Sequence, residues 1–331
     1  MIKNPAARLF LNKRYANGVT FLFLIVIVSV TLVSCVSETP VDSGDTSTSS
    51  SYNLPTEGGE WKPSVSHEGS LPAGMGMIRI EIIGEFVFDS SEVETLRPDI
   101  FQPGHFSLFD IVVHLADRGD IDLDYHFDES MDTHVIDTIN GMGEWWYEAY
   151  YSNGWREPNA FRMDMYPYKD NTYIRLFQEQ SERLVSINHA FQEEVARLSH
   201  NSGIVIIPDV VIESPGSVRT FQDVEVTAHD LRDDVLHPGV VTAMDVVLSL
   251  AEQGELSRLK LTWYESIVTA EPVDSYWLEQ IDEAEAYGSC GFVYEVGARR
   301  FSGFTGSHIH IPSDVRVIVS PEYGLWFWIC L

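Results

Sequence analysis

The chain has 331 residues, 44% of them hydrophobic, which is enough for one large or two ordinary domains. Its 50 acidic residues outnumber its 21 basic residues and give a formal net charge of -29. Such a surface argues against binding to nucleic acid or to an anionic membrane, whereas cationic ligands, metal ions, a high-salt habitat or solubility alone remain open explanations.

Residues 1–34 are predicted to be a targeting segment. A basic N-terminal region without acidic residues precedes an apolar run from Val19 to Val33. The sequence Leu32-Val33-Ser34-Cys35 resembles a bacterial lipobox, which implies cleavage before Cys35 and lipidation of that cysteine. An uncleaved membrane anchor is the alternative. Both place the rest of the chain outside the cytoplasm, attached to a membrane.

Residues 35–74 are predicted to form a disordered tether. The run from Asp42 to Ser51 consists of Asp, Ser, Gly and Thr, and cannot bury enough apolar surface to become ordered.

The segment 75–178 is predicted to be the first folded domain. Alternating isoleucines over 77–88 indicate a half-buried strand. Residues 107–119 are predicted to form a short helix, with Ser107 as N-cap, Asp110 completing a capping box and a buried apolar stripe. Residues 120–128 alternate between apolar side chains and carboxylates. The acidic face, which includes His126, could bind a cation, but we favour a solvated strand face because carboxylates on one strand seldom converge.

An aromatic strand follows in the same domain. Residues 144–155 contain a run of Trp and Tyr that leads into Asn153-Gly154, a strong hairpin signal. Residues 163–177 are predicted to return as further strand.

Residues 179–202 are predicted to be an amphipathic connecting helix, and residues 203–331 a second domain. This domain repeats the order of the first: strands at 204–212 and 218–227, a capped helix within 238–254, and strands at 259–267, 291–296 and 308–318. An offset of 135 residues aligns the two helices without a gap, from Pro103 with Pro238 to Gly119 with Gly254.

The capped helix, Ile139-Asn140-Gly141 and the aromatic strand ending in Asn-Gly together resemble the transcobalamin-like β-grasp domain of bacterial surface lipoproteins. This resemblance implies an α+β fold of two tandem β-grasp-like domains, each a small mixed sheet packed on one helix. It also implies binding of a soluble ligand, with cobalamin as a possible ligand. The candidate ligand-binding residues are Trp146, Tyr150, Tyr151, Asn153 and Trp155.

The aromatic strand has an alternative interpretation, in which its side chains fill the core. Period 2 places Trp145, Tyr147 and Ala149 on one face and Trp146, Glu148 and Tyr150 on the other. We expect the face with Glu148 to be exposed, which makes Trp146 and Tyr150 the leading candidates. The second copy has Phe292 and Val293 in place of Trp145 and Trp146 and lacks the Asn-Gly, so the first domain is the expected binding domain.

Other chemistry is sparsely represented. Cys290 and Cys330 are predicted either to form a disulfide, as an extracytoplasmic compartment allows, or to remain free thiols. His308 and His310 share a strand face but have no evident third ligand, so no metal site is predicted. No recognised catalytic motif is present, no catalytic residue is assigned, and the sequence favours a protein that is not an enzyme.

The leading hypothesis is a lipid-anchored cell-surface protein with duplicated ligand-binding domains. Its expected partners are the membrane, through the lipid, and a soluble small molecule or an envelope component, and not nucleic acid. The alternatives are a structural or adhesive envelope module that binds protein or polysaccharide, and a hydrolase with an unassigned carboxylate pair.

Overall fold

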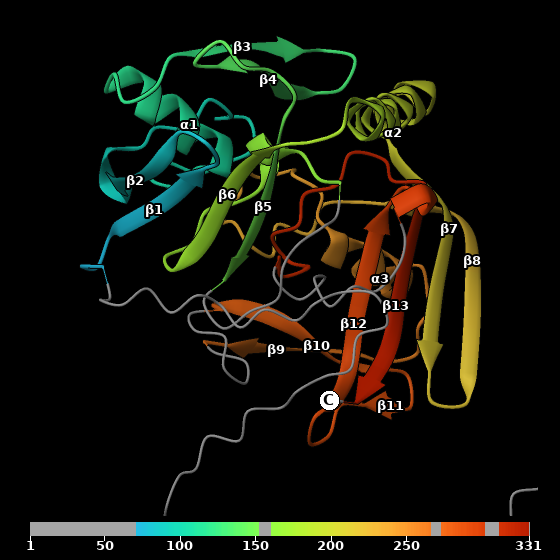
Figure 1. Ribbon diagram of the computed structural model, residues 1–331. Helices are drawn as coiled ribbons and strands as arrows, with labels where there is room; N and C mark the ends of the chain where they lie inside the picture. Colours follow the sequence, from blue (N-terminus) through green and yellow to red (C-terminus); the bar gives the residue numbers. More distant parts are fainter. Residues whose placement is uncertain (1–70, 152–159, 266–272, 302–310, 331) are drawn as a thin grey trace, which may run out of the picture. The chain divides into compact units, whose positions relative to one another are not determined.

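Two four-stranded sheets with the same strand order form the framework of the molecule (Figure 1). The computed structural model describes residues 71–151, 160–265, 273–301 and 311–330, without the side chains of Tyr150 and Tyr151. We refer to residues 75–178 as the first repeat and to residues 203–331 as the second repeat.

The sheet of the first repeat has the order β2-β1-β6-β5, in which β1 and β6 run parallel and the other neighbours antiparallel. A helix and a separate two-stranded hairpin, β3-β4, lie between β2 and β5 in the chain. The elements are β1 (Met75–Ile80), β2 (Gly84–Asp89), η1 (Ser90–Glu92), α1 (Leu108–Asp117), β3 (Leu123–Asp128), β4 (Thr133–Ile139), β5 (Trp145–Tyr151), η2 (Met163–Met165) and β6 (Thr172–Gln178).

The sheet of the second repeat has the order β8-β7-β13-β12, with β7 and β13 parallel. Each strand therefore has its counterpart in the first sheet, and the α+β class expected from the sequence is confirmed. The elements are β7 (Val205–Ser214), β8 (Ser217–Val226), α3 (Ala243–Glu252), β9 (Leu259–Tyr264), β10 (Ser275–Ile281), β11 (Ala284–Glu285), β12 (Cys290–Gly297), η3 (Arg299–Phe301) and β13 (Tyr323–Cys330).

The two repeated helices begin with the capping boxes that the sequence predicts. In α1 the Asp110 carboxylate accepts from the Ser107 backbone N–H at 2.7 Å, while Ser107 Oγ accepts from the Asp110 N–H at 3.3 Å. Thr242 and Asp245 form the same box in α3. The apolar stripe of α1 is fully buried, so the short helix is stabilised by packing as well as by its cap.

Helix α2 (Ser181–His200) connects the repeats, as predicted for residues 179–202. Its buried face carries Ile187, Ala190 and Phe191, together with Glu194. Glu194 tolerates burial because Arg162 of the first repeat donates to it at 2.5 Å.

The two repeats join through equivalent loops. Gln102 N–H donates to Val235 C=O at 3.0 Å, and His237 N–H donates to Ile100 C=O at 2.7 Å. At the repeat offset of 135, Ile100 corresponds to Val235 and Gln102 to His237, so each bond is the counterpart of the other. The contact has the self-complementary form of a two-fold interface, although it lies within one chain.

The main hydrophobic core of the first repeat also includes side chains from the second. Its members from the second repeat are Val235, Leu236, Ile311, Val315, Val317 and Val319. The two repeats therefore do not have wholly separate cores. All described residues belong to one compact unit, Tyr52–Leu331.

Two strand predictions are wrong in detail. Residues 77–88 form a hairpin instead of one strand, because the chain turns at Ile82, which has a φ of 70° and is 79% exposed. Residues 311–318 contain no strand apart from a bridge at Val317, because Pro312 lacks an N–H and Asp314 faces an arginine inside the protein. The last strand of the sheet is instead β13.

The targeting segment at 1–34, Cys35 and the tether up to residue 70 lie outside the described residues. Within the described part of the chain, none of the helices combines the length and the apolarity needed to cross a membrane.

Candidate functional site

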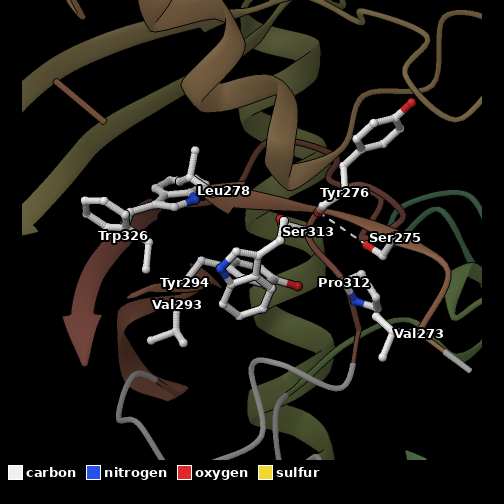
Figure 2. Close-up of a pocket in the computed structure, with 11 residues that line it drawn as sticks. Val273, Ser275, Tyr276, Leu278, Val293, Tyr294, Pro312, Ser313 and Trp326 are labelled. Atoms are coloured by element: carbon white, nitrogen blue, oxygen red, sulfur yellow. Dashed lines mark hydrogen bonds between the residues drawn. The ribbon is translucent and has the colours of Figure 1, made fainter. Parts of the chain in front are cut away.

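The strongest candidate site is a small aromatic pocket between β10 and β12 of the second repeat (Figure 2). Its volume is about 20 Å³, which is room for a single small group. It is lined by Val273, Ser275, Tyr276, Trp277, Leu278, Phe292, Val293, Tyr294, Pro312, Ser313 and Trp326.

Aromatic packing forms the inner wall of this pocket. Trp326 of β13 is 1% exposed and stacks on Tyr294 of β12, with ring centroids 6.2 Å apart and planes inclined by 25°. The Tyr294 hydroxyl donates to the Ile311 carbonyl, which leaves the ring face to the pocket. Because the strands fix these rings, the site is preformed for an apolar group.

A buried ion pair supports one side of the pocket. Asp314 is fully buried and accepts from the Ser275 hydroxyl at 2.6 Å, from the Tyr276 backbone N–H at 2.9 Å and from Arg232 Nη1 at 3.0 Å. These donors satisfy the carboxylate, so Asp314 holds the β10 strand in place.

The first repeat contains the same ion pair. Asp164 is fully buried and accepts from the Thr133 hydroxyl at 2.6 Å, from the His134 backbone N–H at 2.9 Å and from Arg97 Nη1 at 3.1 Å. Burial alone would raise the pKa of Asp164, but the hydrogen bond from His134 and the charge of Arg97 hold the pKa below its usual value. We call each set of an arginine and its buried aspartate the Arg–Asp anchor.

In the first repeat, α2 covers the surface that corresponds to this pocket. Phe191 and Ile187 of α2 form a small core with Met131, and Val135 and Trp146 pack against it. Sheet register and the Arg–Asp anchors align the two repeats at these positions. The pocket residues that correspond to this covered surface are Val273 for Met131, Trp277 for Val135, and Val293 for Trp146.

Comparison with known proteins leaves this chain without a match. No protein-family model, no curated protein and no solved structure matches it. The candidate site is therefore defined by the geometry of this chain alone.

The sequence-based candidates in the first repeat lie elsewhere. Trp146 is half-buried, with its ring centroid 6.4 Å from that of Phe191. The premise that Glu148 faces solvent is wrong: it is 5% exposed and pairs with Arg175 at 2.7 Å. The side chains of Tyr150 and Tyr151, and residues Asn153 and Trp155, lie outside what the structure describes. Trp145 and Tyr147 on the opposite face are buried in the core.

The second-repeat cysteines meet across neighbouring strands. Cys290 of β12 lies opposite Cys330 of β13 and forms a disulfide with it. His308 and His310 lie outside the described residues. Among the described residues, no group of three His, Cys, Asp or Glu side chains is placed to hold a metal ion.

The acidic strand face at 120–128 is a surface feature. His126 pairs with Asp137 of the neighbouring strand at 2.8 Å, and both side chains are about half exposed. Asp124 accepts from the Thr138 hydroxyl at 3.1 Å. Cross-strand partners therefore take up part of this face, in agreement with a solvated strand.

The sequence reasoning missed the Arg–Asp anchors. The segments Leu96-Arg97-Pro98-Asp99 and Leu231-Arg232-Asp233-Asp234 match at the same offset of 135 as the helices, so the gapless repeat extends further upstream. The buried aspartates are harder to align from the sequence, because Pro167 and Pro312 follow similar apolar residues and invite a false match. The equivalent bridges Ser107–Pro167 and Thr242–Val317 show that Val317 is the counterpart of Pro167. Asp314, three residues before Val317, is therefore the counterpart of Asp164.

Proposed function

We propose that the chain is a lipid-anchored extracytoplasmic protein in which two tandem β-grasp-like domains bind a soluble ligand. The lipobox-like sequence before Cys35 supports the anchor. The two sheets have the same strand order, and in each repeat one capped helix follows the second strand of the sheet in the chain. Both features support the duplicated fold. No catalytic role is proposed, because the buried aspartates at the centre of each repeat serve structure.

The observation that carries the proposal is the pocket of the second repeat. Its walls are aromatic and fixed, and α2 fills the equivalent place in the first repeat. This moves the expected binding site from the first to the second repeat. A pocket of about 20 Å³ accepts one protruding apolar group of a larger ligand. Corrinoids are the first class to test, since the sequence resembles transcobalamin-like domains.

The test is a titration of residues 52–331 with cyanocobalamin by equilibrium dialysis, with tryptophan fluorescence as a second readout. Trp277 and Trp326 line the pocket and would report its occupation. We expect saturable binding by the unaltered protein. No binding at millimolar corrinoid would rule out the cobalamin version of the proposal.

The matched variant is Val293→Trp, which introduces into the pocket the tryptophan that the first repeat has at the equivalent position, Trp146. It should fill the cavity and weaken binding by at least about tenfold, which corresponds to about 1.4 kcal/mol. Trp146→Val, made under the helix, should leave binding unchanged. Unchanged affinity in Val293→Trp, with a normal thermal unfolding curve, would move the site away from this pocket.

A further inference from the structure

Each repeat presents an exposed aromatic ring above the arginine of its Arg–Asp anchor. The ring centroid of Phe127 lies 5.6 Å from Arg97 Cζ, and the ring of Trp263 lies 5.2 Å from Arg232 Cζ. The two residues occupy the same place in the β3-β4 and β9-β10 hairpins. They are 43% and 41% exposed, although aromatic side chains of this size usually bury more of their surface.

A second ring on the neighbouring strand fixes each exposed ring. Phe127 lies opposite His134, with ring centroids 5.0 Å apart and planes at 66°. Trp263 lies opposite Tyr276, with centroids 5.1 Å apart and planes at 73°. Edge-to-face contacts of this kind hold both rings in one orientation. The exposed surface is therefore rigid before any partner arrives.

An exposed carboxylate accompanies each ring. Asp99 accepts from Arg97 Nε at 3.0 Å and Nη2 at 2.8 Å, and Asp234 accepts from Arg232 at 2.8 and 2.9 Å. Their side chains are 62% and 58% exposed. A carboxylate has about four lone-pair sites, so the arginine bonds, three to Asp99 and two to Asp234, leave acceptor capacity for hydroxyl donors.

These features select the chemistry of the partner. The guanidinium already interacts with each ring, which makes the ring less attractive to a second cation and leaves it suited to apolar C–H groups. The net charge of -29 repels polyanions. A sugar ring offers a C–H face for the aromatic ring and hydroxyls for the carboxylate. Because the arrangement occurs twice, it fits a partner with repeating units.

We propose that Phe127 and Trp263 are two equivalent platforms for a neutral polysaccharide, each stacking against one sugar ring. The Trp263 platform shares Tyr276 with the aromatic pocket. Stacking on the exposed ring does not require the pocket to be occupied, so this proposal does not rest on the corrinoid proposal. It assigns a binding role to the exposed rings of the two hairpins that cover the Arg–Asp anchors.

The test is affinity electrophoresis of the full chain, solubilised in detergent, through gels that contain a neutral glucan, a mannan or a galactan. We expect retardation on at least one of them. Phe127→Leu and Trp263→Leu keep an apolar cover over the arginine but remove the ring. Each should lower retardation by more than half, because one platform alone loses the gain from simultaneous binding, and the double variant should abolish it. Phe127→Trp and Trp263→Phe keep a ring and should retain retardation.

Tyr287→Ala is the matched control, because it removes an aromatic side chain that is 67% exposed and is not a member of either platform. It should migrate as the unaltered protein does. The proposal is overturned if none of the three polysaccharides retards the chain, or if the double leucine variant, with a normal unfolding curve, is still retarded. Retention only on a lysine-rich peptide gel would also overturn it, in favour of a basic peptide partner.

Discussion

At the scale of single residues, the buried arginines connect separate segments of each repeat. Arg97 and Arg232 are 5% and 4% exposed, and each joins the loop before a helix to the hairpin that follows it. A buried cation is tolerated only when carboxylates and carbonyls satisfy it. In both repeats the buried arginine is satisfied by the same kinds of partner, namely a buried aspartate and a backbone carbonyl of the following hairpin.

The first prediction concerns Asp164. Replacing it by Asn leaves Arg97 buried next to a neutral partner, and should lower the free energy of unfolding by about 3–5 kcal/mol. Asp99→Asn removes the more exposed carboxylate of the same arginine and should cost no more than about 1 kcal/mol. Urea unfolding at pH 7 measures both. Equal losses in the two variants would contradict a special role for the buried carboxylate.

The same carboxylate makes stability depend on pH. The pKa of Asp164 is lower in the folded protein than its ordinary value of 3.8, so its stabilising contribution is fully present above that value. The contribution is lost as the pH falls further, through the folded-state pKa. Part of the acid sensitivity of the protein should therefore be absent from Asp164→Asn, as a comparison of unfolding at pH 7 and pH 3 would show.

At the scale of elements, helix α2 is the main difference between the repeats. Phe191 of α2 stacks beneath Arg162, with Arg162 Cζ 4.3 Å from the ring centroid, and contacts Trp146. The helix thus supplies the first repeat with a cover that the second repeat does not receive from any described helix.

The second prediction follows from this packing. Phe191→Ala should destabilise the protein by about 3–5 kcal/mol, because it opens a cavity and removes the ring beneath Arg162. Val185→Ala changes a residue of the same helix that is 67% exposed and should stay within about 0.5 kcal/mol of the unaltered protein. Thermal unfolding followed by circular dichroism compares them. A loss below about 1 kcal/mol for Phe191→Ala would show that α2 is loosely attached.

The sequence was most informative about single elements. Capping residues and periodicity predicted α1, α2 and α3, because a helix has local signals at its ends and along its buried face. The hairpin turn at Ile82 was missed, since it has none of the usual Asn-Gly signals and an isoleucine with positive φ is unusual. The burial of Glu148 was missed because it depends on Arg175, which follows it on another strand.

At the scale of the whole molecule, polar contacts connect the two repeats. Lys169 of the first repeat donates to the Val273 carbonyl of the second, beside Arg232 and its aspartates. At the offset of 150 that aligns the buried aspartates Asp164 and Asp314, its counterpart is Val319, which is buried in the core of the first repeat. The junction is therefore polar on one side and apolar on the other.

The third prediction concerns Lys169. Burial, aided by Arg232 and opposed by the nearby aspartates, lowers its pKa to about 8 from 10.5. Between these pH values the unfolded chain binds more protons than the folded chain, so this lysine makes stability rise with pH across that window. Lys169→Met should lose this rise, whereas Lys260→Met, at an exposed lysine, should keep it. Chemical denaturation at pH 7.5 and 10 gives the free energy of unfolding at each pH. An equal rise in Lys169→Met and in the unaltered protein would contradict the prediction.

The candidate site could be predicted from the sequence only in part. Trp146, on the aromatic strand that the sequence analysis singled out, is the counterpart of Val293 in the pocket. The sequence could not show that α2 occupies this place in the first repeat, because the contact of Phe191 with Trp146 joins residues far apart in the chain. The pocket residues Val273 and Pro312 have no chemical signature of their own.

The shared core has a consequence for folding during synthesis. The first repeat needs Val315, Val317 and Val319 to complete its hydrophobic core, and these lie close to the C-terminal end of the chain. A chain that emerges from the N-terminus onwards therefore cannot finish folding its first repeat until almost all of the second has followed. The two repeats become stable together, and a nascent chain exposes an incomplete, aggregation-prone core until residues 315–319 have emerged.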